Sequence, residues 1–206
     1  MNVSISKQRL NGLRGKDYVF GVVIGKKLML VELVSGSLVV LKEIQCVDGI
    51  MTMVWLDDSI IVGTMSGYSL ISCVSGQSVV IFSSPDVSHP PRLRLLVKEL
   101  KVLLLVDNVG IIVDAHGQPV GGSLVFHHGL ESIGEISSYV VVVNGGKMDL
   151  YHKRSGVCIQ SLPFGGEGIG RCIVASEEEG DGEFVAVATA TKVCCFHNPG
   201  SLQLLL

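Results

Sequence analysis

Short runs of apolar, largely β-branched residues alternate along the chain with turns rich in Gly, Ser, Asn and Asp. The clearest case lies at Val102 to Val106 and Ile111 to Asp114, two runs joined by the polar turn Asp107-Asn108. Strand-forming residues on both sides of a short polar turn are typical of a β-hairpin. The pattern therefore predicts one tight hairpin in this stretch.

The same strand-turn-strand unit recurs along the chain, with starts about 40 residues apart. The further copies lie at Val19 to Leu33, Ile60 to Ser72, Val140 to Tyr151 and Val185 to Phe196. Paired strands repeated at this period are typical of propeller blades, so we predict an all-β fold, a partial β-propeller of about five blades. Because an incomplete ring leaves sheet edges bare, we expect a fragment of a larger propeller of about seven blades, or dependence on a partner.

The two ends of the chain differ from this pattern. Residues 1–17 combine basic residues and glycines without apolar periodicity, and we predict an N-terminal connection or loop there. The predicted propeller spans residues 18–198. Asn198-Pro199-Gly200 ends the β pattern, and the leucine-rich segment after it has the composition of a helix start. Residues 199–206 are therefore predicted to begin a truncated C-terminal helical region.

Charge and composition exclude several classes of partner. The formal net charge is −3, and Lys and Arg are scattered, whereas nucleic-acid binding needs clustered positive charge. Polar residues interrupt every apolar run well short of the roughly eighteen residues that a membrane-spanning helix needs. The N-terminus lacks the basic start and apolar core of a secretory signal. We therefore expect a cytoplasmic protein that binds no nucleic acid and contacts membranes only through partners.

Three segments carry a family resemblance: Ile61-Val-Gly-Thr-Met-Ser-Gly-Tyr68, Leu103-Leu-Leu-Val-Asp-Asn-Val-Gly-Ile-Ile-Val-Asp-Ala-His-Gly-Gln-Pro-Val120 and Tyr139-Val-Val-Val-Val-Asn-Gly-Gly-Lys-Met-Asp-Leu-Tyr151. They resemble the citron homology (CNH) domain, in the branch of the vacuolar sorting and transforming growth factor-beta receptor-associated proteins, and are most similar to a plant vacuolar sorting protein. The resemblance implies a non-enzymatic scaffold of the CORVET and HOPS tethering complexes, peripheral on endosomal or vacuolar membranes. The implied partners are a Rab-type small GTPase and the class C core subunits. No short motif marks the GTPase-binding surface, so no interaction residue is assigned.

Two other functional classes are open at this point. The same domain occurs as a docking module in signalling kinases and GTPase exchange factors, although the leucine-rich end of the chain favours a tethering protein. A propeller enzyme would need His and carboxylate side chains gathered at the centre of the ring, and the inner strands are apolar. We therefore predict no catalytic residue and no cofactor.

Several residues are candidates for chemistry, and each has a simpler interpretation. Gly165 to Arg171 resembles a phosphate loop but lacks the Lys and Ser or Thr of a Walker motif, which favours a loop between blades. His127-His128 could bind a metal, yet no further ligands follow at a suitable spacing. Asp107, Asp114 and His116 could suggest acid–base chemistry, but turn positions for Asp and surface exposure for His explain them.

The remaining candidates concern sulfur, acidic and aromatic side chains. The six cysteines show no paired metal-ligand spacing and are interpreted as small buried hydrophobes. Cys194 and Cys195 are expected to point to opposite faces of one strand, with one of them packed inward. Glu177 to Glu183 is interpreted as a solvated acidic loop, with a docking patch as the alternative. Trp55, the single tryptophan, is expected to pack between blades.

Overall fold

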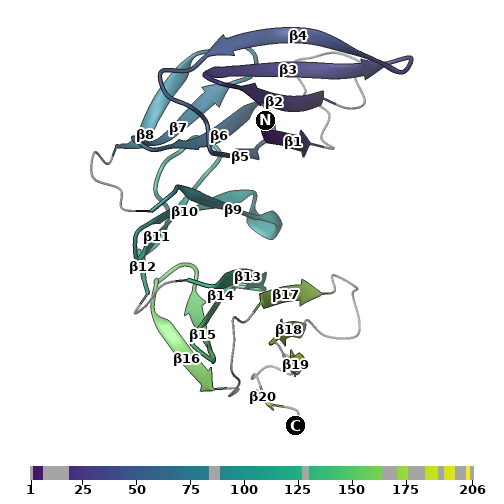
Figure 1. Ribbon diagram of the computed structural model, residues 1–206. Helices are drawn as coiled ribbons and strands as arrows, with labels where there is room; N and C mark the ends of the chain where they lie inside the picture. The colour runs from purple at the N-terminus through teal and green to yellow at the C-terminus, as the bar shows by residue number, and fades with distance from the viewer. Residues whose placement is uncertain are drawn as a thin grey trace. The chain divides into compact units, whose positions relative to one another are not determined.

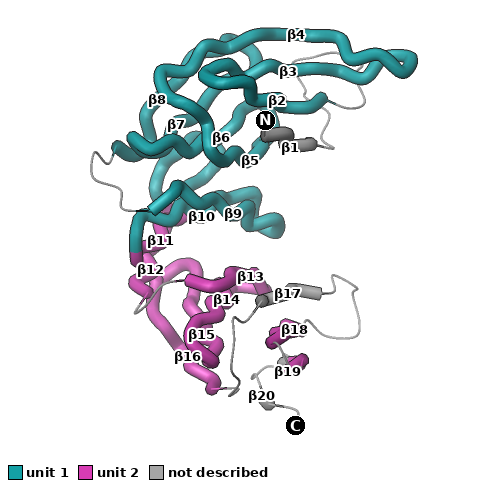
Figure 2. The backbone as a smooth tube through the Cα atoms, viewed as in Figure 1, with its two compact units in different colours: residues 1–107, 113–119 teal, residues 108–112, 120–206 magenta. Residues whose placement is uncertain are grey.

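The computed structural model describes residues 2–6, 19–83, 89–126, 130–163, 171–175, 184–189, 193–197 and 203–204. Within these ranges the chain consists of β-strands and connections, with one three-residue 3-10 helix, η1 (Val97–Glu99). The chain divides into two compact units (Figure 2): unit 1 contains residues 1–107 and 113–119, and unit 2 contains residues 108–112 and 120–206. Each unit is described by itself.

The strands form five antiparallel sheets of four strands each, which Figure 1 labels along the chain. The first sheet has β1 (Asn2–Ser6), β2 (Val19–Ile24), β3 (Lys27–Val34) and β4 (Ser37–Gln45); the second has β5 (Thr52–Trp55), β6 (Ser59–Thr64), β7 (Gly67–Ser72) and β8 (Ser78–Ser83). The third has β9 (Arg92–Leu96), β10 (Lys101–Val106), β11 (Val109–Val113) and β12 (Leu124–Val125). The fourth has β13 (Ser132–Ile136), β14 (Tyr139–Asn144), β15 (Lys147–His152) and β16 (Cys158–Pro163); the fifth has β17 (Arg171–Ala175), β18 (Phe184–Ala188), β19 (Val193–His197) and β20 (Gln203–Leu204). In every sheet the strands follow their sequence order, so the predicted row of about five four-stranded blades is confirmed.

The N-terminal segment corrects one expectation. The sequence predicts a connection or loop over residues 1–17, but Asn2–Ser6 form β1 and pair with β2, with Val3 opposite Val22 and Ile5 opposite Phe20. Val3 and Ile5 alternate with polar neighbours, which is the period of a half-buried strand. The basic residues that suggest a loop all lie after Ser6, in residues 7–17, outside the described part of the chain.

The C-terminal segment corrects a second expectation from the sequence. The sequence predicts the beginning of a helix at residues 199–206, whereas Gln203–Leu204 form the short strand β20 on the edge of β19. Leu204 is opposite Phe196 and Gln203 is opposite His197. A sheet edge offers unpaired backbone groups to any extended segment nearby, and this edge is paired here by the leucine-rich segment. Residues 199–202 and 205–206 lie outside the described residues.

The second and fourth sheets repeat each other in a fixed register of 80 residues. Strands β6, β7 and β8 begin at 59, 67 and 78, and β14, β15 and β16 begin at 139, 147 and 158. The turns that follow the third strands also match: the Gly76 N–H donates to the Ser72 carbonyl and the Gly156 N–H donates to the His152 carbonyl, both at 2.8 Å. Each residue of the second sheet therefore has a structural counterpart 80 positions later.

Apolar side chains on facing sheets form the core of each unit. In unit 1 one cluster joins the first two sheets, and in unit 2 another joins the fourth and fifth sheets. The first contains Val19, Val23, Leu28, Leu30, Ile44, Ile50, Trp55, Ile60, Val62, Ile71 and Cys73, and the second contains Ile136, Val141, Val143, Met148, Leu150, Val185 and Val187. Burial of such a side chain contributes about 1.5–3 kcal/mol to folding. The sheets are therefore held together by the alternate, inward-facing residues of their strands.

Candidate functional site

The predicted acid–base candidates have turn roles. Asp114 Oδ1 accepts hydrogen bonds from the backbone N–H groups of His116 and Gln118, both at 2.9 Å, and so fixes the turn after β11. Asp107 has a left-handed backbone (φ 50°) in the β10–β11 turn, and its Oδ1 lies 3.5 Å from His89 Nδ1 at the surface. His116 is exposed. The turn positions of both Asp residues and the exposure of His116 are confirmed.

Several other candidates lie in segments about which the structure gives no side-chain information. His127-His128, residues 165–170 and residues 177–183 lie outside the described residues, and Arg171 is placed only as the first residue of β17. Among the residues that are described, no three His, Cys, Asp or Glu side chains come together as a metal site.

Cys194 and Cys195 occupy opposite faces of β19, as predicted. Cys194 packs against the core of the fourth and fifth sheets, whereas Cys195 is exposed. The wider interpretation of the cysteines as buried hydrophobes holds for Cys73, but Cys158 is exposed as well. Cys158 is the first residue of β16, which is the last strand of the fourth sheet.

Burial controls the reactivity of Cys73. Desolvation raises the pKa of this thiol from 9.0 to about 12, with the negative charge of Asp58 adding to the shift. At pH 8 only about one Cys73 side chain in ten thousand is then a thiolate, and the thiolate is the reactive form. We expect iodoacetamide to label Cys195 in the folded chain and to leave Cys73 unmodified, as measured by peptide mass spectrometry. Both should be labelled in guanidinium, and equal labelling rates in the folded chain would contradict this placement.

Trp55 packs between the first two sheets, which confirms its predicted position. Its ring approaches Gly21 so closely that a Cβ on Gly21 would lie 3.2 Å from the indole Cζ2. The side chain belongs to the core cluster of unit 1, and its Nε1–H has no hydrogen-bond partner. The missing side chain at Gly21 makes room for the indole.

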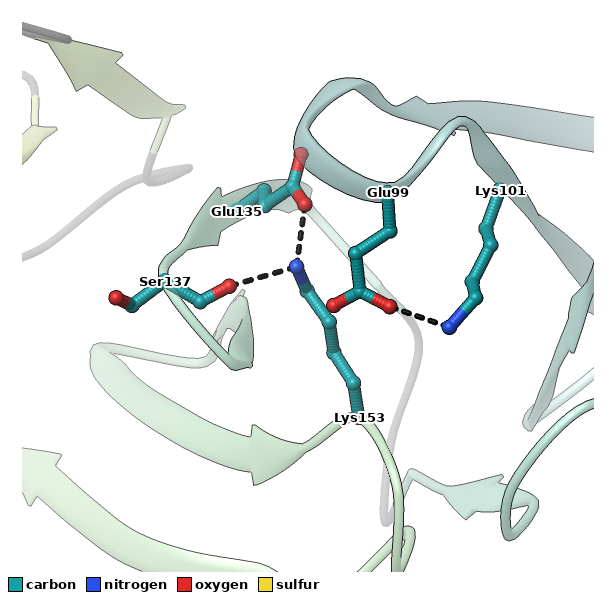
Figure 3. A network of polar contacts seen from close by, with 5 residues as sticks. All are labelled: Glu99, Lys101, Glu135, Ser137 and Lys153. Carbon is teal, nitrogen blue, oxygen red and sulfur yellow. Dashed lines mark hydrogen bonds and ion pairs between the residues drawn. The ribbon is translucent and has the colours of Figure 1, made fainter.

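A buried ion pair in unit 2 has no counterpart among the sequence predictions. Lys153 Nζ bonds Glu135 Oε1 and donates to the Ser137 carbonyl oxygen at 2.7 Å (Figure 3). The two charged side chains are only 5% and 10% exposed. The register of 80 residues identifies their counterparts in unit 1 as Cys73 and Trp55, which belong to the apolar core. The fourth sheet thus has an ion pair where the second sheet has apolar packing.

A second buried polar group lies on β15. The Asp149 carboxylate, 3% exposed, accepts a hydrogen bond from Ser161 Oγ at 2.5 Å and pairs with Lys147 Nζ at 3.1 Å. Nearby, burial raises the pKa of Tyr151 to about 12, with smaller contributions from Cys158 and Asp149. The Tyr151 hydroxyl donates to the Val125 carbonyl at 3.1 Å. These side chains bond one another and the backbone, so we assign them a role in stabilising the sheet.

The exposed apolar residues indicate a surface suited to binding other proteins. Many of them lie on outer strands, which have a sheet neighbour on one side only. They include Leu38, Val39 and Val40 on β4, Val79 and Val80 on β8, and Ile159 on β16. Large exposed apolar patches on a folded protein mark protein or membrane interaction sites or ligand-binding grooves. The outer strands are therefore the candidate functional surface.

Comparison with known proteins finds a curated relative of this chain. No family model matches the chain. Over 183 residues, which are 85% of the chain, it is 56% identical to vacuolar sorting protein 3 of Arabidopsis thaliana. The chain is homologous to this part of vacuolar sorting protein 3. The sequence resemblance to a plant vacuolar sorting protein is thus confirmed, and the chain spans 19% of the length of that relative.

Solved structures confirm the fold predicted for this chain. The AfRom2 CNH domain aligns with a TM-score of 0.58 and 11% identity, over 94% of this chain and 62% of that structure. The WD40 domain of Toxoplasma gondii coronin aligns with a TM-score of 0.66 and 11% identity, over 98% of this chain and 56% of that structure. At such low identity the likeness concerns the fold alone. The fold is a partial β-propeller.

The described residues contain no helix that is long and apolar enough to cross a membrane.

Proposed function

We propose that the chain is a non-enzymatic interaction scaffold in vacuolar protein sorting, acting within a tethering complex of the CORVET or HOPS type. The observation that carries the proposal is the 56% identity with vacuolar sorting protein 3 over most of the chain. The structural contacts of Asp107, Asp114 and Asp149 agree with it, because these carboxylates fix turns and a buried network. Exposed apolar outer strands suit the binding of other proteins.

The proposed partners are a Rab-type small GTPase and the class C core subunits of the complex. Binding to them would hold the protein at the cytoplasmic face of an endosomal or vacuolar membrane, with no direct insertion into lipid. A tethering scaffold of this kind recognises the GTP state, because the γ-phosphate orders the switch loops that form the binding surface of a small GTPase.

The GTPase part of the proposal is tested by capture. The intact protein that contains this chain is incubated with endosomal Rab-type GTPases loaded with a GTP analogue or with GDP. We expect at least about tenfold more capture of one GTPase in its GTP-analogue form. Equal capture of both forms, or capture of neither, would remove the GTPase from the proposal.

The sorting role is tested separately by exchange of the homologous segment. This chain replaces the matching 183-residue segment of the Arabidopsis vacuolar sorting protein 3, in cells that lack the native protein. We expect vacuolar delivery of a soluble cargo to be restored. A stable chimaera that assembles into its complex and leaves the cargo missorted would contradict the proposed role.

A further inference from the structure

The fifth sheet repeats the fourth in a fixed register of 45 residues. β14 begins at 139 and β18 begins at 184, and the pairing of each strand with its neighbour is the same in both sheets. Val141 is opposite Leu150 in the fourth sheet, and Ala186 is opposite Cys195 in the fifth. Each described residue of β18 and β19 therefore has a counterpart 45 positions earlier. Four of these pairs are Val141 and Ala186, Val143 and Ala188, Met148 and Val193, and Leu150 and Cys195.

In the fourth sheet these four positions contact the next sheet along the chain. All four side chains are buried, and they belong to the core cluster that also contains Val185 and Val187 of the fifth sheet. Because side chains alternate along a strand, the neighbouring Val140 and Val142 point to the other face of the fourth sheet. The four positions therefore define the face on which the following sheet packs.

The second sheet uses the same positions in the same way. Two of the corresponding residues, 80 positions before those of the fourth sheet, are Gly63 and Tyr68. The Tyr68 hydroxyl donates to the Leu105 carbonyl of the third sheet. A Cβ on Gly63 would lie 2.8 Å from the Cβ of Pro91, which immediately precedes β9. In both sheets this face of the second and third strands therefore contacts the following sheet.

The fifth sheet has apolar side chains at the same four positions. Val185, Val187 and Cys194 face the fourth sheet, so the alternate residues of β18 and β19 point to the opposite face. We call these residues the β18–β19 face: Ala186, Ala188, Val193 and Cys195. The two alanines are half-buried, Val193 is 64% exposed and Cys195 is exposed. A strand with one face in water alternates apolar and polar residues, whereas β18, like β14, is apolar on both faces.

We propose that the β18–β19 face packs against a further four-stranded sheet of the intact protein, as the fourth sheet packs against the fifth. The contact continues an interface that successive sheets of the chain already form, through the same positions of the same strands. The chain covers 62% of the AfRom2 CNH domain and 56% of the coronin WD40 domain, so both solved structures extend beyond the aligned sheets. The occupant is therefore a blade of the same propeller.

The side chains of the β18–β19 face determine what the incoming sheet presents to it. In the existing contact, Val185 and Val187 pack against the four buried positions of the fourth sheet. The fifth sheet has smaller side chains at three of these positions, with Ala, Ala and Cys in place of Val, Val and Leu. Packed sheets lie about 10 Å apart and leave few voids between them. We therefore expect the second strand of the incoming sheet to present side chains larger than Val, such as Leu, Ile or Phe.

Cys195 reports directly on the β18–β19 face. The intact protein that contains this chain is treated with N-ethylmaleimide, and the modified peptides are quantified over time by mass spectrometry. Cys195 should react at least about tenfold more slowly than Cys158, because the reagent reaches a covered thiol only when the sheets separate. Cys158 is exposed and is the internal control. Desolvation raises the pKa of the Cys158 thiol and slows its own reaction, which makes the comparison stricter.

Two variants separate packing on this face from other causes of protection. Ala186→Glu places a charge on the β18–β19 face and should raise the labelling rate of Cys195 towards that of Cys158, because an unpaired carboxylate opposes burial. Ile159→Glu, at an exposed position of β16, is the matched control and should leave Cys195 protected. Cys73 is buried and stays unmodified as long as a variant is folded; if it reacts, the wild-type rates decide.

The proposal is overturned if Cys195 and Cys158 react at equal rates in the wild-type protein. Protection of Cys195 that appears only after another subunit is added would also overturn it, and would assign the β18–β19 face to a separate protein. Protection that persists in folded Ala186→Glu would show that Cys195 is shielded by something other than a sheet on this face.

Discussion

Replacement of Lys153 by Met should lower the free energy of unfolding by about 3–5 kcal/mol, because it removes the cation that pairs with the buried Glu135 carboxylate. Both side chains are almost fully removed from water, and Lys153 also satisfies the Ser137 carbonyl. Guanidinium titration followed by circular dichroism measures the loss. Lys27→Met is the matched control: Lys27 pairs with Glu43 at 3.3 Å, but both side chains are about half exposed. An exposed pair of this kind contributes less than about 1 kcal/mol.

A double variant distinguishes the net contribution of the ion pair to stability from the destabilisation caused by removing only one partner. The counterparts of Lys153 and Glu135 in the second sheet, Cys73 and Trp55, are apolar and well packed, so the blade accepts apolar side chains at both positions. Glu135→Leu combined with Lys153→Met should therefore be within about 1–2 kcal/mol of the wild type. If the free energy of unfolding of the double variant fell by the sum of the decreases in the two single variants, the two charges would act independently.

The strands could be predicted from the sequence because each hairpin is encoded locally. Two-residue turns with Gly, Asn or Asp separate β-branched runs, and the period near 40 then places the blades. β1 could not be recognised in this way, because the basic residues after Ser6 dominate the composition of the N-terminal segment. β20 could not be recognised either, because two residues carry no periodicity; this strand exists through pairing with β19.

The buried ion pair could not be predicted from local sequence. Lys153 lies in the string His-Lys-Arg-Ser-Gly, which has the composition of a solvated turn. Glu135 lies two residues before the polar pair Ser137-Ser138, where a charged side chain is usually exposed. Only the register of 80 residues relates Lys153 to the buried Cys73. The end of the β3–β4 hairpin presents the reverse case: its apolar residues have the pattern of a core strand, yet all residues from 33 to 40 are exposed.

Substitution of Gly156 by Ala should lower the free energy of unfolding by about 3–5 kcal/mol, through two separate causes. The backbone at Gly156 is left-handed (φ 72°), which costs an L-residue about 1–2 kcal/mol. The added Cβ would in addition lie 2.4 Å from the Ser123 carbonyl oxygen, and a backbone atom cannot move aside as a flexible side chain can. The segment is held in place by the Gly122 N–H, which donates to the Arg154 carbonyl at 2.9 Å.

Gly36→Ala provides the comparison that separates these causes. Gly36 has a similar backbone (φ 82°), but no atom lies within 4 Å of the position of its Cβ. Its substitution should therefore cost only the conformational part, about 1–2 kcal/mol. Gly122→Ala would disturb the same backbone contact from the opposite segment, because its Cβ would lie 2.3 Å from the Ser155 carbonyl oxygen. Once one substitution has opened the contact the second has less to displace, so Gly122→Ala and Gly156→Ala together should cost less than the sum of their separate effects. Additive losses in thermal or denaturant unfolding would show that the two glycines do not share one backbone contact.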